Sequence, residues 1–150
     1  MRKSAKVLII LMFSITACRQ NIEKIERQYL DKTIKEVNID GDYRWVIILP
    51  GLGCHGCIKE GEVFMKEHIT DKRILFLVTK VSSIKILQQK TGVSFDEHSN
   101  IFIDRNNLFD IPTDNRIYPC VVELKNGEVI NHSFQSPKNA AFHQLEQQLK

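Results

Sequence analysis

The stretch Trp45–Cys57, WVIILPGLGCHGC, decides the fold of this 150-residue chain. Its first five residues form a continuous apolar run, which is typical of a strand buried on both faces of a sheet. The glycine-rich turn that follows carries two overlapping motifs. A G-x-G-x-x-G pattern begins at Gly51 and matches the fingerprint of a dinucleotide-binding site, while Cys54-x-x-Cys57 matches a redox or metal-binding pair.

The residues after the turn alternate between helical and strand patterns. Segment 58–69 predicts a helix of about three turns with Ile58, Val63, Phe64 and Ile69 on its apolar face, and Gly61 weakens it by about 1 kcal/mol relative to alanine. The next elements are a buried strand at 74–78 and an amphipathic helix at 82–91 that stops at Gly92. Strand, helix, strand, helix predicts parallel strands joined by right-handed crossovers.

The C-terminal third predicts a hairpin and a closing helix. One strand is expected at 100–103, followed by a turn-rich passage and two strands at 120–124 and 128–134. Asn126-Gly127 between them supplies the positive φ of a tight hairpin. Ser136-Pro137 is expected to open the last helix, with proline at the first helical position. We therefore predict an α/β fold with a central mixed sheet flanked by helices.

A dinucleotide-binding site is disfavoured because the acidic residue that it requires is missing. Such a site needs an acidic residue at the end of the second strand, about 20 residues on, to bond the ribose hydroxyl. Here that strand ends in Val78-Thr79-Lys80. A lone glycine fingerprint is a weak signal, so the cysteine pair is favoured.

The N-terminus resembles a bacterial lipoprotein signal. Three basic residues precede the apolar run 7–17, which is shorter than the ~20 residues of a membrane-spanning helix. The run ends in Ile15-Thr16-Ala17-Cys18, similar to a lipobox, whose cysteine is diacylated and becomes the mature N-terminus. An ordinary cleaved signal with an accidental cysteine is the simpler alternative.

Removal of the signal peptide changes the charge balance. The chain has 21 basic and 18 acidic residues, and residues 1–17 hold three of the basic and none of the acidic ones. The mature chain is therefore neutral, with no basic field for nucleic acid or acidic lipid. We predict a signal peptide at 1–17, a tether at 18–32 from lipidated Cys18, and one domain at 33–150. Within the tether, Ile22, Ile25 and Tyr29 have helical spacing, which predicts a short frayed or packed-on helix.

The position of the cysteine pair between a strand and a helix favours redox chemistry. Cys54 follows a buried strand and precedes a helix, so unpaired N–H groups and the helix dipole would stabilise its thiolate. Cys57, one turn into the helix, is placed to attack a mixed disulfide on Cys54. His55 between them adds positive charge and favours a more oxidising couple.

With Tyr118-Pro119 leading into the hairpin, the chain resembles the thioredoxin superfamily, especially its membrane-anchored extracytoplasmic members. The resemblance covers residues 45–150 and implies a thioredoxin-like fold. It also implies that Pro119 is cis and lies against the cysteine pair, and that the backbone of Tyr118 is free to pair with a bound peptide.

Three positions depart from the family pattern. Gly53 stands where an aromatic residue commonly precedes the first cysteine, and Gly56 replaces a proline frequent before the second. Ile48 occupies the position of the buried acid of cytoplasmic thioredoxins, so the proton acceptor for Cys57 is missing. The GLG turn indicates an altered or widened substrate groove.

Other interpretations of the cysteines remain open. The loop also resembles the Cu(I)-binding loop of heavy-metal-associated domains, and a thioredoxin-fold copper carrier could draw a third ligand from one of four histidines. These are His55, His68, His98 and His132. A catalytically inactive scaffold is a further alternative. Haem attachment is excluded because Ile58 stands where histidine is required, and no second ligand pair for zinc is visible at a recognisable spacing.

The sequence thus predicts a thiol:disulfide oxidoreductase without metal or cofactor, lipid-anchored in the cell envelope and facing the periplasm. Its catalytic residues would be Cys54 and Cys57, modulated by His55 and Gly56. Its partners would be cysteine-containing extracytoplasmic proteins and a redox partner. Cys120, the remaining thiol, is interpreted as a small buried residue at the start of a strand, with a third redox role as the alternative.

Overall fold

The computed structural model describes residues 21–39 and 42–150. The predicted signal peptide, the predicted lipidation site Cys18 and residues 40–41, where Asp40-Gly41 predicts a turn, lie outside the described residues. Among the residues described, none of the helices combines the length and the apolar character needed to cross a membrane.

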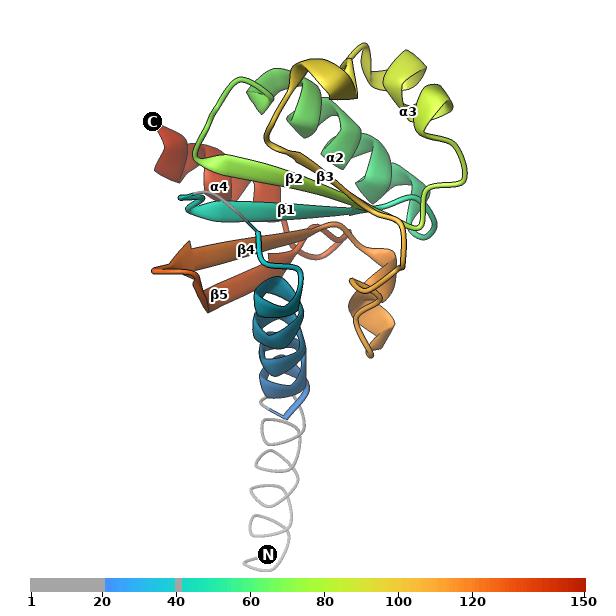
Figure 1. The fold of residues 1–150 in the computed structure, drawn as a ribbon. Coiled ribbons are helices and arrows are strands. Elements are labelled where there is room, and N and C mark those ends of the chain that lie inside the picture. The colour runs from blue at the N-terminus through green and yellow to red at the C-terminus, as the bar shows by residue number, and fades with distance from the viewer. Residues whose placement is uncertain (1–20, 40–41) are drawn as a thin grey trace, which may run out of the picture.

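A five-stranded mixed sheet forms the centre of the domain (Figure 1). The strand order is β3-β2-β1-β4-β5; β1, β2 and β3 are parallel, while β4 runs antiparallel to both β1 and β5. The predicted α/β class and mixed sheet are confirmed. The strands are β1 (Trp45–Pro50), β2 (Ile74–Thr79), β3 (Ile101–Asp104), β4 (Cys120–Lys125) and β5 (Glu128–Phe134).

Helices cover both faces of this sheet. Helix 21–36 lies on the opposite side from α2 and α3 (Figure 1), and it crosses the boundary predicted between residues 32 and 33. The labelled helices are α2 (His55–His68), α3 (Ile84–Thr91) and α4 (Ala141–Leu149), with short 3-10 turns η1 (Phe95–Glu97) and η2 (Asp114–Ile117).

Successive side chains of β1 point to opposite faces of the sheet, so they belong to two separate hydrophobic cores. Ile47 and Leu49 join the core beneath α2 and α4, where the Phe64 and Phe142 rings stack with centroids 4.7 Å apart. Val46 and Ile48 join the core on the other face. Leu30 and Ile34 of helix 21–36 are buried there, so this helix is part of the domain.

The apolar face of α2 agrees in part with the predicted one. Phe64 and Ile69 are buried as expected, together with Met65, whereas Val63 is 47% exposed. Helix α2 begins at His55, three residues before the predicted start. Gly61 has a packing role: a Cβ atom there would lie 2.6 Å from Leu49 Cδ2 and 3.4 Å from the Phe142 ring. The glycine therefore lets α2 approach β1 closely.

The hairpin prediction is confirmed, and the start of the last helix is wrong. Asn126 and Gly127 adopt φ values of 54° and 77°, as a tight hairpin requires. The closing helix begins at Ala141 and not at Pro137, because Ser136 and Asn139 exchange two backbone hydrogen bonds in a turn first. Buried Gln135 accepts a hydrogen bond from the N–H of Phe142 and so satisfies the first turn of α4.

Candidate functional site

Cys54 lies at the N-terminus of α2, as the sequence predicts. It is the N-cap residue, with extended backbone angles, and its carbonyl accepts the first helical hydrogen bond from Ile58 at 2.9 Å. The Cys54 side chain makes no capping hydrogen bond, but it lies at the end of α2 where the first-turn N–H groups have no intrahelical partner, and that turn, HGCI, brings no acidic residue. Both features stabilise negative charge on the Cys54 sulfur.

Cys54 and Cys57 are joined by a disulfide, with their Cα atoms 5.4 Å apart. Cys57 is 5% exposed and faces the protein interior, while Cys54 is half-buried and His55 and Gly56 are exposed. The pair is therefore asymmetric: an incoming molecule reaches Cys54 first. This asymmetry matches the roles expected of an attacking and a resolving thiol.

The end of η2 packs directly against the cysteine loop. The Cys54 N–H donates to the carbonyl of Ile117 at 3.0 Å. Gly53 has φ +147°, and a Cβ atom there would lie 2.2 Å from the same carbonyl oxygen. An aromatic residue does not fit at Gly53, which accounts for the glycine at this position.

The glycine pattern is explained by packing. Gly51 approaches the backbone of Lys80 as closely as Gly53 approaches Ile117, since its Cβ would lie 2.5 Å from the Lys80 carbonyl. The third glycine, Gly56, lies inside α2, and its Cβ would meet nothing within 4 Å. The first two glycines thus let the loop fit between two backbone segments.

The expectation of a cis Pro119 is wrong. No peptide bond is cis among residues 21–39 and 42–150, so the Tyr118–Pro119 bond is trans. The Tyr118 N–H donates to the carbonyl of Asn115 at 2.9 Å, so the carbonyl is the backbone group of Tyr118 that remains for a bound chain. Pro119 is buried, and its carbonyl accepts a hydrogen bond from Gln135.

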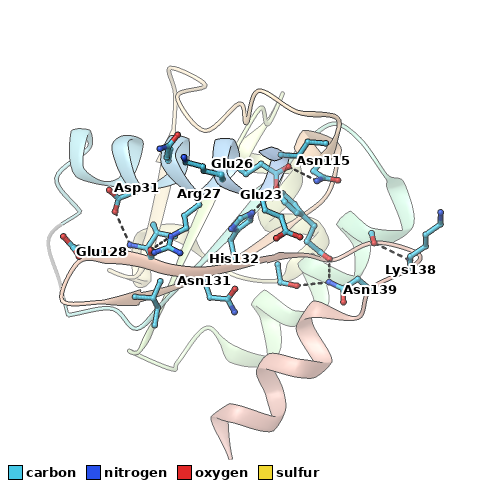
Figure 2. Close-up of a pocket in the computed structure, with 18 residues that line it drawn as sticks. Glu23, Glu26, Arg27, Asp31, Asn115, Glu128, Asn131, His132, Lys138 and Asn139 are labelled. Carbon is cyan, nitrogen blue, oxygen red and sulfur yellow. Dashed lines mark hydrogen bonds and ion pairs between the residues drawn. The ribbon is translucent and has the colours of Figure 1, made fainter. Parts of the chain in front are cut away.

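A buried glutamate that the sequence analysis missed holds η2 in place. Glu26, on helix 21–36, is 1% exposed. It accepts hydrogen bonds from Thr113 Oγ1 at 2.6 Å and Asn115 Nδ2 at 2.8 Å, and its second oxygen lies 3.0 Å from His132 Nε2. Figure 2 shows Glu26 and His132 pointing toward one another, with Asn115 beside them. Helix 21–36 is thereby linked to the segment that contacts Cys54.

Three of the histidines considered for copper lie elsewhere. His132 is engaged with Glu26. His68 is the last residue of the 14-residue α2, and at about 1.5 Å per residue it lies roughly 20 Å from the cysteines. Neither can complete a site with the cysteine pair. His98 is two residues before Asn100, whose side chain donates to the carbonyl of Ile69 at the far end of α2, so His55 is the histidine that remains beside the cysteines.

Cys120 is separated from the disulfide by the sheet. It is fully buried, pairs with Ile48 in the β1–β4 register, and belongs to the core beneath helix 21–36. Phe64 and Met65 of α2 belong to the opposite core. Burial raises the pKa of the Cys120 thiol well above its ordinary range, and the nearby Glu26 carboxylate raises it further. This placement fits the interpretation of Cys120 as a structural residue.

We expect Cys120 to resist alkylation in the folded chain, because the neutral buried thiol is a poor nucleophile. Iodoacetamide labelling followed by peptide mass spectrometry should show no modification of Cys120 in buffer and complete modification in denaturant. Labelling in buffer at the rate of free cysteine would contradict this assignment.

Exposed apolar side chains flank the cysteine loop. Leu52, two residues before Cys54, is 68% exposed, and Ile117 is 39% exposed. Leu52 also lines a cleft with Val81, Ile84 and Ile103, beyond the carboxyl ends of the parallel strands. These side chains offer an apolar contact surface next to the half-buried sulfur.

Comparison with known proteins gives no relatives: no family model, no curated protein and no solved structure matches the chain.

Proposed function

We propose that this protein is a thiol:disulfide oxidoreductase of thioredoxin-like fold that exchanges disulfides with extracytoplasmic proteins. The observation that carries the proposal is the position of the cysteine pair: Cys54 caps the N-terminus of α2, and Cys57 lies buried one turn later, bonded to it. A disulfide across three residues closes too short a loop to stabilise the fold much, which favours a chemical role.

The proposed reaction proceeds in two exchanges. The Cys54 thiolate attacks one sulfur of a substrate disulfide, forming a mixed disulfide and releasing the other substrate sulfur as a thiolate. The Cys57 thiolate then attacks Cys54 Sγ, which closes the 54–57 disulfide and releases the second substrate sulfur. Two electrons pass from the pair to the substrate; the same steps in reverse oxidise a substrate dithiol.

The fold supports the thioredoxin-like assignment. A buried parallel strand leads into the cysteine loop, a helix follows it, and the β4–β5 hairpin comes directly after Pro119. The residues before the hairpin lie against Gly53 and Cys54, where the resemblance places the peptide-binding segment. The trans Pro119 and the engaged Tyr118 N–H are departures, so we propose that substrate contacts rely on Leu52 and Ile117 as well as on the Tyr118 carbonyl.

The proposed location rests on the lipobox-like sequence. A diacylated Cys18 would anchor the chain in the bacterial envelope with the domain facing the periplasm. That compartment keeps thiols oxidised, so both the substrates and a redox partner would be extracytoplasmic.

Trapping of mixed disulfides tests the function. Cys57→Ser leaves the nucleophile without its resolving thiol and should accumulate covalent complexes with periplasmic proteins, visible on non-reducing gels and lost on reduction. Cys54→Ser is the matched control and should trap nothing. Absence of complexes with both variants, together with an equal loss of Cu(I) binding in both, would overturn the oxidoreductase proposal in favour of a copper carrier.

A further inference from the structure

The end of α2 farthest from the cysteine pair carries a cluster of side chains that are able to act as metal ligands. Glu67 and His68 lie in the last turn of α2, and Glu146 projects from α4 beside them. One ligand atom from each of the three lies within 4.8 Å of the others. His68 Nε2 and Glu146 Oε1 are 3.9 Å apart. Ligands about 2.0–2.2 Å from one Zn²⁺ ion are separated by about 3–4 Å, so small side-chain rotations bring these atoms around a single ion.

The two helices that supply these groups are held together by packing. The Phe64 and Phe142 rings stack between α2 and α4, one turn from the ligands on each helix. The His68 ring lies against Phe64, with centroids 4.3 Å apart, and only 25% of the His68 side chain is exposed. The geometry of the cluster is therefore set by the core and not by the surface alone.

Neither carboxylate of the cluster pairs with a lysine or an arginine of the described residues. Within residues 21–39 and 42–150, Glu67 has no ion pair and Glu146 pairs only with histidines. Two carboxylates this close repel one another unless a cation lies between them. His143 Nδ1 lies 3.7 Å from Glu146 Oε2, and its Nε2 is 3.2 Å from Gln147 Nε2. We therefore treat His143 as a positioning residue for Glu146 and not as a ligand.

We propose that Glu67, His68 and Glu146 bind one divalent transition-metal ion, with Zn²⁺ as the ion that fits best, and that the bound ion ties α4 to α2. An imidazole nitrogen with two carboxylates suits Zn²⁺, whereas Mg²⁺ and Ca²⁺ prefer oxygen ligands alone. Water completes the coordination shell. The inference is independent of the redox proposal, and the sequence analysis missed it because the ligands are divided between helices far apart in the chain.

Titration with Zn²⁺ tests the site directly. The full chain is used with the 54–57 disulfide oxidised and Cys18 replaced by serine, because exposed thiolates would bind Zn²⁺ themselves. Calorimetry should give one Zn²⁺ per chain. At 100 times the dissociation constant, Zn²⁺ should shift the unfolding equilibrium toward the folded state by about a hundredfold, which appears as a higher Tm.

Three variants and one control assign the ligands. Glu67→Gln, His68→Ala and Glu146→Gln should each abolish the stoichiometric binding and the Tm shift. His98→Ala removes a histidine outside the cluster and should retain both. Circular dichroism in the absence of metal checks folding, and Glu67→Gln, at an exposed position, keeps the test decisive if another variant unfolds. Failure of Zn²⁺ to bind the parent chain, or binding unchanged in the Glu67 and His68 variants, would overturn the proposal.

Discussion

Replacing Gly53 by alanine is expected to destabilise the folded chain by about 2–4 kcal/mol and to expose Cys54 to a changed environment. The added Cβ would lie 2.2 Å from the carbonyl oxygen of Ile117, and the backbone φ of +147° is one that residues with side chains rarely adopt. The Ile117 oxygen belongs to the backbone and not to a flexible side chain. The cysteine loop or η2 must therefore move to make room for the added Cβ. The 3.0 Å hydrogen bond from the Cys54 N–H to Ile117 breaks when it does.

Urea denaturation measures the loss of stability, and the alkylation rate of reduced Cys54 against pH measures its local environment. We expect the rate profile of the Gly53→Ala variant to shift, because the peptide group next to the sulfur loses its hydrogen-bond acceptor. An unchanged free energy of unfolding together with an unchanged profile would show that the contact between η2 and the cysteine loop does not exist in solution.

Gly56→Ala is the matched control for this experiment. Its Cβ would meet nothing within 4 Å, and residue 56 is the second residue of α2. Alanine is favoured over glycine by up to about 1 kcal/mol at helical positions, so this variant should be slightly more stable than the parent chain. The two substitutions, identical in chemistry and three residues apart, should therefore have effects of opposite sign.

The neighbourhood of the cysteines could be predicted from the sequence because it depends on local patterns. An apolar run of strand length, a glycine-rich turn and a helical pattern place Cys54 at a helix start whatever the rest of the chain does. The Asn126-Gly127 turn is equally local, since positive φ values are required at both residues. The order of the predicted strands and helices, together with this hairpin, was enough to predict a mixed sheet.

Other features depend on contacts between distant segments and could not be predicted in this way. The rotation that buries Met65 and exposes Val63 is set by β1 and α4 packing against Gly61. Pro137 has the properties of a first helical residue, but the Ser136–Asn139 turn and the Gln135 side chain delay the helix to Ala141. The cis assignment of Pro119 came from a family resemblance alone.

Helix 21–36 could be predicted from the sequence only in part. The spacing of Ile22, Ile25 and Tyr29 predicts a helix, yet Ile22 and Ile25 are each 41% exposed. The face that packs on the sheet carries Glu26 and Leu30, and a charged residue four positions before a leucine is a weak signal of burial. A buried carboxylate needs several partners, and these come from residues nearly 90 positions away in the chain.

Glu26→Ala is expected to destabilise the domain by about 3–5 kcal/mol, because it leaves the partly buried Thr113, Asn115 and His132 side chains without their shared acceptor. Glu26→Gln keeps the side-chain volume and one acceptor oxygen, so its cost should be clearly smaller. Glu36→Ala, at an exposed position on the same helix, is the control and should change stability by no more than about 0.5 kcal/mol.

The reactivity of Cys54 shows whether Glu26 only stabilises the core or also positions η2 against the cysteine loop. Thr113 caps η2, Asn115 lies within it, and η2 ends at the carbonyl that accepts the Cys54 N–H. In Glu26→Gln, which should stay folded, a loosened η2 should alter the alkylation rate of reduced Cys54 while the buried Cys120 stays unreactive. Equal alkylation of Cys54 in Glu26→Gln and in the parent chain would mean that the glutamate stabilises the core alone and that η2 is held by other contacts.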